Sequence, residues 1–422
     1  MLKQIATNEL KKGSFNLNKV IVIGGGPAGM MAALEAAKNK NQVILIEKNK
    51  NLGKKLLITG KGRCNLTNYS DLNEHIKNIV DNPDFMYSAL AEFDAYRLYY
   101  FFEELGLPLK IERGNRVFPK SNRSQDVLKV LQKELFKYNV ELIQDQVVEI
   151  LVKDQKAGGV NLKYQGQLEA DGVILAAGGS SYPQTGSDGS GFKLAQETGH
   201  KIIEPEPGLC GLKTEENWIY EAQGLKLKYV SLKLLKRGEE VFSEFGDLEI
   251  RDKYLDGPII ISASMHIDQN PEAYQLEIDL KPALDYQTLD QRILRDFDKY
   301  SNKYFGNSLG DLLPQKLIPV ILKLSSIDYN KTVNQITAEE REELIYLLKK
   351  LKLNIKAKKG FERAIVTRGG INTEEINPKT MESRLIDNLY FAGEVIDLAA
   401  MTGGYNLQIA FSTAYKAGNS LK

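Results

Sequence analysis

Short apolar runs alternate with amphipathic stretches along this chain, a pattern typical of the strands and helices of an α/β protein. The first run, Val20–Ile23, contains no polar residue, which indicates a strand buried on both faces. An alanine-rich helical stretch follows, and a second apolar run, Val43–Ile46, ends at Glu47. This strand–helix–strand pattern predicts a parallel sheet that begins near the start of the chain.

Three glycines, Gly24, Gly26 and Gly29, follow the first strand with the spacing GxGxxG. Gly24 lets the chain turn sharply, Gly26 lets a pyrophosphate approach the backbone, and Gly29 lets the helix pack closely on the sheet. The start of the helix offers N–H groups to the phosphates. Glu47 lies where a carboxylate accepts hydrogen bonds from ribose hydroxyls. A glycine-rich structural turn is the alternative, but the position of the motif and the acid favour a dinucleotide site.

The segment Lys48–Asn68 resembles a nucleotide-hydrolysing P-loop only superficially. The spacing between Gly53 and Gly60 is too long, and Gly62 stands where a Ser or Thr would hold magnesium. We interpret the segment as a loop that crosses the cofactor cleft.

The end of this loop would bring Arg63, Cys64 and Asn65 near the reactive ring of the cofactor. Arg63 has a simpler interpretation as a loop-stabilising ion pair, and Cys64 as a buried, small apolar residue. For Cys64 we favour the buried role over a catalytic thiol. A dithiol reductase needs two spaced cysteines here, whereas the chain's other cysteine is Cys210.

The middle of the chain changes in character. From about Ile202 to Leu280, short β-rich runs alternate with turns, which predicts an antiparallel barrel or sandwich. These runs are Leu225–Lys236, Glu240–Phe245, Pro258–Ala263 and Tyr274–Asp279, and helical stretches follow at Thr288–Tyr300, Leu309–Leu324 and Thr337–Leu351. We therefore expect an inserted domain at 197–355 between two parts of one cofactor domain, 1–196 and 356–422.

Two later strands also run into glycine-containing segments. Asp171–Ala177 leads into the loop Gly178–Gly191, which can lay its backbone against a dinucleotide a second time. Leu389–Ala392 is followed by Gly393 and Glu394, and in dinucleotide flavoproteins such a pair places a carboxylate on the ribityl chain.

A glycine-containing turn, Thr402–Gly404, then leads into a predicted helix at about Tyr405–Ala417. The N–H groups at its start would point at the pyrimidine edge of a flavin and stabilise negative charge there. A turn with an ordinary helix cap is the alternative. Together with the GxGxxG motif at the other end of the chain, the pattern favours flavin.

Composition narrows the classes of partner. The chain has 422 residues, with 56 Lys and Arg against 55 Asp and Glu, so it has no general attraction for nucleic acid or an anionic membrane. No apolar run approaches a membrane span, and residues 1–18 lack the apolar core of a secretory signal, so we expect a short extension there. Two distant cysteines suit a reducing cytoplasm, and three histidines at no ligand spacing give no metal site.

Five blocks of the chain resemble bacterial NAD(P)/FAD-dependent oxidoreductases of the aminoacetone oxidase and bile-acid flavoprotein family. They are residues 53–68, 113–128, 174–195, 364–397 and 402–418, and the similarity covers almost the whole chain. The resemblance implies an α/β fold with a glutathione-reductase-type, Rossmann-like FAD-binding domain. This domain would be split in sequence by an inserted β-barrel-like and helical domain.

The resemblance also implies FAD as the cofactor, with NAD(P)H as a transient electron donor. Val148 matches a main-chain contact to adenine. The full set of implied contacts is Gly24, Gly26, Pro27, Ala28, Gly29, Glu47, Lys48, Arg63, Cys64, Asn65, Val148, Ala176, Gly178, Gly393, Glu394, Gly404, Asn406 and Leu407. Leu398–Ala400 and Asp256–Pro258 depart from the family pattern beside the expected substrate space, so no relative's substrate is carried over.

The favoured function is hydride transfer between flavin N5 and a small organic substrate. In an oxidase, an amine or amino ketone reduces FAD and dioxygen reoxidises it; in a reductase, NAD(P)H reduces FAD and a double bond is reduced. No catalytic base stands out, and Arg63 and Tyr405 are candidates for ring or substrate contacts. We expect a monomer or homodimer with no nucleic-acid or membrane partner.

Two alternatives remain from the residues. A flavin-dependent tRNA-modifying protein could use the basic runs Lys226–Arg237 and Lys349–Lys359 as a local patch. A non-catalytic flavin redox sensor is the other.

Overall fold

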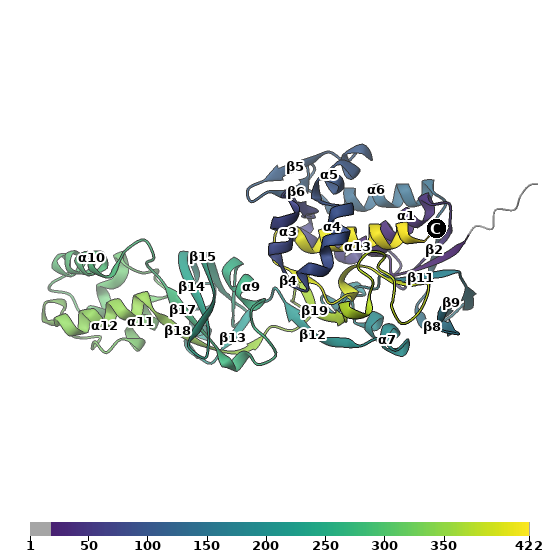
Figure 1. The fold of residues 1–422 in the computed structure, drawn as a ribbon. Helices are drawn as coiled ribbons and strands as arrows, with labels where there is room; N and C mark the ends of the chain where they lie inside the picture. Colours follow the sequence, from purple (N-terminus) through teal and green to yellow (C-terminus); the bar gives the residue numbers. More distant parts are fainter. Residues whose placement is uncertain (1–17, 422) are drawn as a thin grey trace, which may run out of the picture.

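Five parallel strands form the central sheet. The sheet belongs to the larger half of the molecule, on the right in Figure 1. The computed structural model describes residues 18–421, so the extension predicted at 1–18 lies outside the described residues except for Asn18. Register places Ile23 beside both Ile46 and Leu175, so several strands end at the same edge of the sheet. In spatial order the strands are β20 (Leu389–Phe391), β11 (Gly172–Leu175), β1 (Lys19–Ile23), β2 (Gln42–Glu47) and β7 (Glu141–Gln144).

Helices from the two ends of the chain pack together in this half: α1 (Pro27–Lys38) and α13 (Tyr405–Ser420). Small residues make the close approach possible. A Cβ atom on Gly418 would lie 2.5 Å from the Ala32 carbonyl oxygen. A Cβ atom on Gly29 would lie 1.7 Å from the Gly24 carbonyl oxygen, so only glycine lets α1 pack this closely on the strand end.

The other elements of this half surround the sheet. The helices are α2 (Lys54–Ile58), α3 (Leu72–Asn78), α4 (Tyr87–Glu92), α5 (Ala95–Glu104), α6 (Ser124–Lys137) and α7 (Ser190–Glu197). One small antiparallel sheet contains β3 (Thr67–Asn68), β6 (Arg116–Pro119) and β5 (Leu109–Glu112). A second contains β10 (Gly166–Glu169), β9 (Lys156–Leu162) and β8 (Val147–Lys153), and a strand pair joins β4 (Ile79–Asp81) to β21 (Ala399–Ala400).

The inserted part is a closed antiparallel barrel, which confirms the barrel implied by the family resemblance. Its strands, in order, are β13 (Leu212–Thr214), β16 (Tyr254–Asp256), β15 (Glu239–Arg251), β14 (Lys226–Lys236), β17 (Tyr274–Asp279) and β18 (Leu351–Lys358). It is accompanied by α8 (Trp218–Glu221), α9 (Pro258–Ser264), α10 (Tyr286–Lys299), α11 (Ile318–Leu324) and α12 (Ala338–Lys349). Figure 1 shows the barrel between the helical end, formed by α10, α11 and α12, and the larger half.

Two paired strands, β12 (Ile202–Gly208) and β19 (Val366–Ile371), connect the barrel to the larger half. β18 runs across the boundary that we placed at 355/356, and the exact division of the domains stays a prediction. Within residues 18–421, no helix combines the length and apolar character needed to cross a bilayer.

Three element predictions are wrong in this part. Pro258–Ala263 is helical rather than extended, because Pro258 suits the first turn of a helix and a bare Gly246 leaves room for Ile259. The helix predicted at Leu309–Leu324 begins only at Ile318, beyond the helix-breaking Pro314. Leu351, assigned to a helix, begins a strand in which apolar and polar residues alternate.

Candidate functional site

A cavity of about 340 Å³ lies at the edge of the central sheet where β1, β2 and β11 end. Its walls include residues 23–28 and 46–49 from the first strand–helix–strand unit, 176–178 after β11, Leu209, residues 365–366, and residues 394, 398, 401–404, 406–407 and 409–410 from the last segment. Ligands of doubly wound α/β proteins bind at this edge. The two ends of the chain therefore share one crevice, as the sequence predicted.

Most of the predicted cofactor residues line this cavity. They are Gly24, Gly26, Pro27, Ala28, Glu47, Lys48, Asn65, Ala176, Gly178, Glu394, Gly404, Asn406 and Leu407. Their contacts with FAD stay predictions, but the fold brings them to one place.

Three predicted residues lie beside or behind the wall. Gly29 packs against the end of β1, and a Cβ atom on Gly393 would lie 2.7 Å from the Ala28 Cβ atom, so both glycines serve close packing. Val148 is 45% exposed and its neighbour Val147 lines the cavity, so the main-chain contact of Val148 with adenine stays a prediction.

Arg63, Cys64 and Tyr405 do not line the cavity either. The Arg63 guanidinium lies 2.5 Å from the Glu112 carboxylate and 4.1 Å from the centre of the Phe118 ring, which fits the loop-stabilising interpretation. Cys64 is fully buried, and burial raises the pKa of its thiol to about 12. The buried Tyr405 ring packs edge-on against the His75 ring on α3.

The start of α1 has the features that a pyrophosphate needs. No side chain caps this helix, and no acidic residue lies in its first turn. A Cβ atom on Gly26 would meet nothing within 4 Å, so the bare backbone faces open space. The Glu47 carboxylate is fixed nearby, because it accepts from the Gly25 N–H at 2.7 Å and from both Asn49 amides at 2.8 and 2.7 Å. These groups fit the adenosine and diphosphate part of a dinucleotide.

An ion pair in the cavity wall joins Lys55 to Glu394. Lys55 Nζ lies 2.5 Å from Glu394 Oε2, and Glu394 Oε1 accepts from the Thr367 N–H and the Ser181 hydroxyl, both at 2.8 Å. Burial opposes ionisation of Glu394, but the Lys55 charge and these hydrogen bonds hold its pKa below the ordinary value. Sequence reasoning did not identify Lys55 as a site residue. The only indication was its position within residues 53–68, one of the segments that resemble the flavoprotein family.

Other residues of the cavity wall offer polar groups that fit the edge of a flavin ring. Gly404, with φ of 109°, precedes α13, and no side chain caps that helix. Asn406 is held by the Ala400 backbone, accepting from its N–H at 2.9 Å and donating to its carbonyl at 2.7 Å. Asn65 Oδ1 is buried without a hydrogen-bond partner in the described chain, so it can accept from a ligand N–H.

These features define a Rossmann-type flavoprotein oxidoreductase, and the comparisons with known proteins agree. The chain belongs to the family described as HI0933-like protein Rossmann domain, whose model matches residues 18–420.

Relatives of known activity match nearly end to end. The chain is 34% identical to the 3-dehydro-bile acid delta(4,6)-reductase of Clostridium scindens, over 96% of this chain and 99% of that protein. It is 29% identical to the ribosomal RNA dihydrouridine synthase of Escherichia coli, over 95% and 97%. The structure of 3-ketosteroid-delta4-(5alpha)-dehydrogenase from Rhodococcus jostii has the same fold, with 16% identity, a TM-score of 0.52 and coverage of 97% and 98%.

Proposed function

We propose that this protein is an FAD-dependent reductase that saturates a carbon–carbon double bond conjugated with a carbonyl group. NAD(P)H would reduce the bound FAD, the reduced flavin would supply a hydride from its N5 atom to one carbon of the double bond, and a proton from solvent would complete the saturated bond. The observation that carries the proposal is one cavity lined both by the uncapped start of α1 and by a group of apolar side chains. The two relatives named above support the reaction type, because a delta(4,6)-reductase and a dihydrouridine synthase both form a saturated bond.

The residues of the chain would divide the binding of FAD among them. The backbone N–H groups of Gly26 and Ala28 would hold the pyrophosphate, and Glu47 would accept from the ribose hydroxyls. Glu394, kept ionised by Lys55, would accept from the ribityl hydroxyls. Asn65 and the start of α13 would hold the polar edge of the ring.

The apolar wall would exclude water from the reacting atoms and bind the hydrocarbon part of a substrate. It consists of Leu209, Ile365, Val366, Leu398 and Met401, from three separate segments. A water-poor site favours hydride transfer over side reactions of the reduced cofactor. The wall suits a flat or alicyclic apolar molecule better than a strongly charged one.

RNA is a second candidate substrate, favoured by the 29% identity to a ribosomal RNA dihydrouridine synthase. The barrel gives it little support, because lysines of the basic run on β14 are paired with acids. Lys226 Nζ lies 3.2 Å from Glu249 Oε1, and Lys233 Nζ lies 2.7 Å from Glu240 Oε2. Such pairing leaves less positive charge for phosphates.

Anaerobic half-reactions test the proposal. The purified protein, loaded with FAD, is titrated with NADH and NADPH while flavin absorbance is followed, and then mixed with conjugated enones or with uridine-containing RNA. We expect bleaching by a nicotinamide and return of the colour with an enone, with a saturated product. Bleaching by amines with peroxide release in air would identify an oxidase, and dihydrouridine formation would identify the RNA enzyme.

A further inference from the structure

The barrel and the larger half have separate hydrophobic cores. Between them lies a much smaller apolar cluster, whose buried members are Leu209, Met265, Val366 and Ala399. Domains joined by so small an apolar contact move relative to each other unless something else fixes them. The junction therefore depends on its polar contacts.

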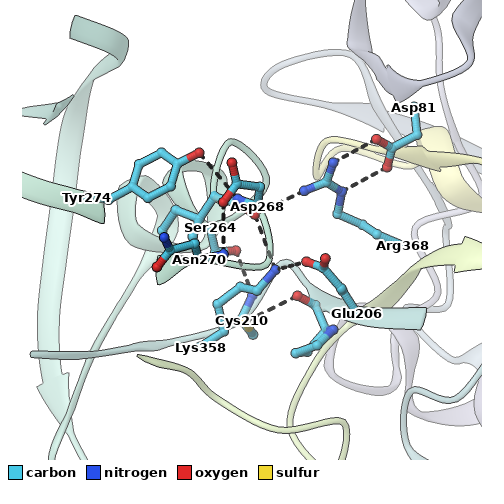
Figure 2. A network of polar contacts seen from close by, with 11 residues as sticks. Asp81, Glu206, Cys210, Ser264, Asp268, Asn270, Tyr274, Lys358 and Arg368 are labelled. Carbon is cyan, nitrogen blue, oxygen red and sulfur yellow. Dashed lines mark hydrogen bonds and ion pairs between the residues drawn. The ribbon is translucent and has the colours of Figure 1, made fainter. Parts of the chain in front are cut away.

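Figure 2 shows a polar network at this junction. Arg368 on β19 makes a two-point ion pair with Asp81 on β4, with distances of 2.8 Å from Nε to Oδ2 and 2.7 Å from Nη2 to Oδ1. Its Nη1 donates to the carbonyl oxygen of Ile267, in the loop after α9, at 3.2 Å. Lys358 on β18 donates to the same carbonyl at 3.2 Å and pairs with Glu206 on β12.

The network reaches the cavity wall through β4. Asp81 lies opposite Ala399 in the antiparallel pair of β4 and β21. Leu398 and Met401, on either side of β21, line the cofactor cavity. One guanidinium thus connects a barrel carbonyl to β4, the partner of the strand whose flanking residues line the apolar wall.

This ion pair differs from an ordinary surface pair. The side chains of Arg368 and Asp81 are only 20% and 17% exposed, so solvent screens their attraction poorly. The planar guanidinium makes three directed hydrogen bonds at once, which a lysine ammonium at the end of a flexible chain does not reproduce.

We propose that Arg368 is a positioning residue that holds the barrel over the apolar end of the cavity and fixes β21 there. It thereby keeps solvent from the ring and sets the width of the substrate space. The proposal rests on the proposed function in one respect: the enclosed cavity is the FAD site.

Variants of the pair test this role against a matched control. Arg368→Gln and Asp81→Asn each remove one charge of the pair; Asn keeps the shape of Asp, and Gln is a shorter, neutral polar side chain. Arg341→Gln is the control. The Arg341 side chain is 19% exposed, and its Nε lies 2.5 Å from Asp290 Oδ1. This pair lies in the helical end of the molecule, away from the cavity. Arg368→Lys keeps the charge without the planar group.

Distance measurements between spin labels report the position of the barrel. Labels are attached through Lys120→Cys in the larger half and Lys352→Cys on the barrel, both exposed, while the buried native cysteines stay unlabelled. We expect Arg368→Gln and Asp81→Asn to widen the distance distribution about twofold, Arg368→Lys less, and Arg341→Gln not at all. In the FAD-loaded protein we also expect iodide to quench flavin fluorescence about threefold more strongly in the two pair variants.

A distance distribution in folded Arg368→Gln and Asp81→Asn equal to that of the parent would overturn the proposal. So would equal broadening in the Arg341→Gln control. A protein that retains no FAD would contradict the proposed function alone, because the distance measurement needs no flavin.

Discussion

Lys55 and Glu394 are 339 positions apart in the chain, yet Lys55 Nζ lies 2.5 Å from Glu394 Oε2. The contact joins the segment after the first strand–helix–strand unit to the glycine–acid pair that follows β20. Formation of the cofactor cavity thus depends on the return of the chain to its starting domain after the barrel is complete.

Breaking this pair should destabilise the fold. In Lys55→Met the Glu394 carboxylate loses its counter-charge in a poorly solvated site, and we expect a loss of roughly 2 kcal/mol in the free energy of unfolding. The double variant with Glu394→Gln should lose less than the sum of the single changes. Urea unfolding of the four proteins measures this coupling, and strict additivity would mean that the pair contributes nothing.

The same pair predicts how stability depends on pH. The pKa of Glu394 lies below its ordinary value of 4.5 in the folded protein, so its contribution is complete above pH 4.5 and is lost as the pH falls through the folded-state pKa. The stability difference between the parent and Glu394→Gln should therefore be constant from neutral pH down to about 5 and shrink in more acidic solution. A difference that grew on acidification would show the opposite pKa shift.

Gly26 should matter for cofactor affinity rather than for folding. Its φ of −77° suits any residue, and an added methyl group would meet no protein atom, so Gly26→Ala should unfold at the parent temperature. We expect about tenfold weaker FAD binding, because the methyl group occupies the space of the pyrophosphate. The matched control is Gly158→Ala, another glycine with open surroundings, which lies on β9 away from the cavity. Equal FAD affinity in Gly26→Ala would place the diphosphate elsewhere.

Neither cysteine should take part in the reaction. Burial raises the pKa of Cys64 to about 12 and that of Cys210 to about 11, so neither forms the reactive thiolate near neutral pH. Iodoacetamide should leave the native protein unmodified and its flavin reduction unchanged, and both cysteines should react after unfolding. Loss of activity on alkylation of the folded protein would reinstate a catalytic role for Cys64.

The sequence was most informative where chemistry and local structure coincide. The strand, the glycine spacing and the acid at Glu47 lie within one short unit, so their positions in the fold follow from local rules. The loop residue Arg63 shows the limit: its type suited a cofactor contact, but Glu112 and Phe118, distant in sequence, bind it instead. Pairings of this kind, like that of Arg368 with Asp81, depend on tertiary structure and leave no spacing signal.

One wrong element prediction in the barrel has a similar origin. The run Ile259–Ile261 has the composition of a strand, and its packing beside Gly246 makes it helical.

The most direct measurement is a crystal structure of the protein with FAD. We predict one FAD per chain, with the diphosphate at the N–H groups of Gly26 and Ala28 and the isoalloxazine ring between Asn65 and the start of α13. The apolar wall at Leu398 and Met401 should lie beside the ring. FAD bound in the reverse direction, or outside the crevice shared by the two ends of the chain, would contradict the account.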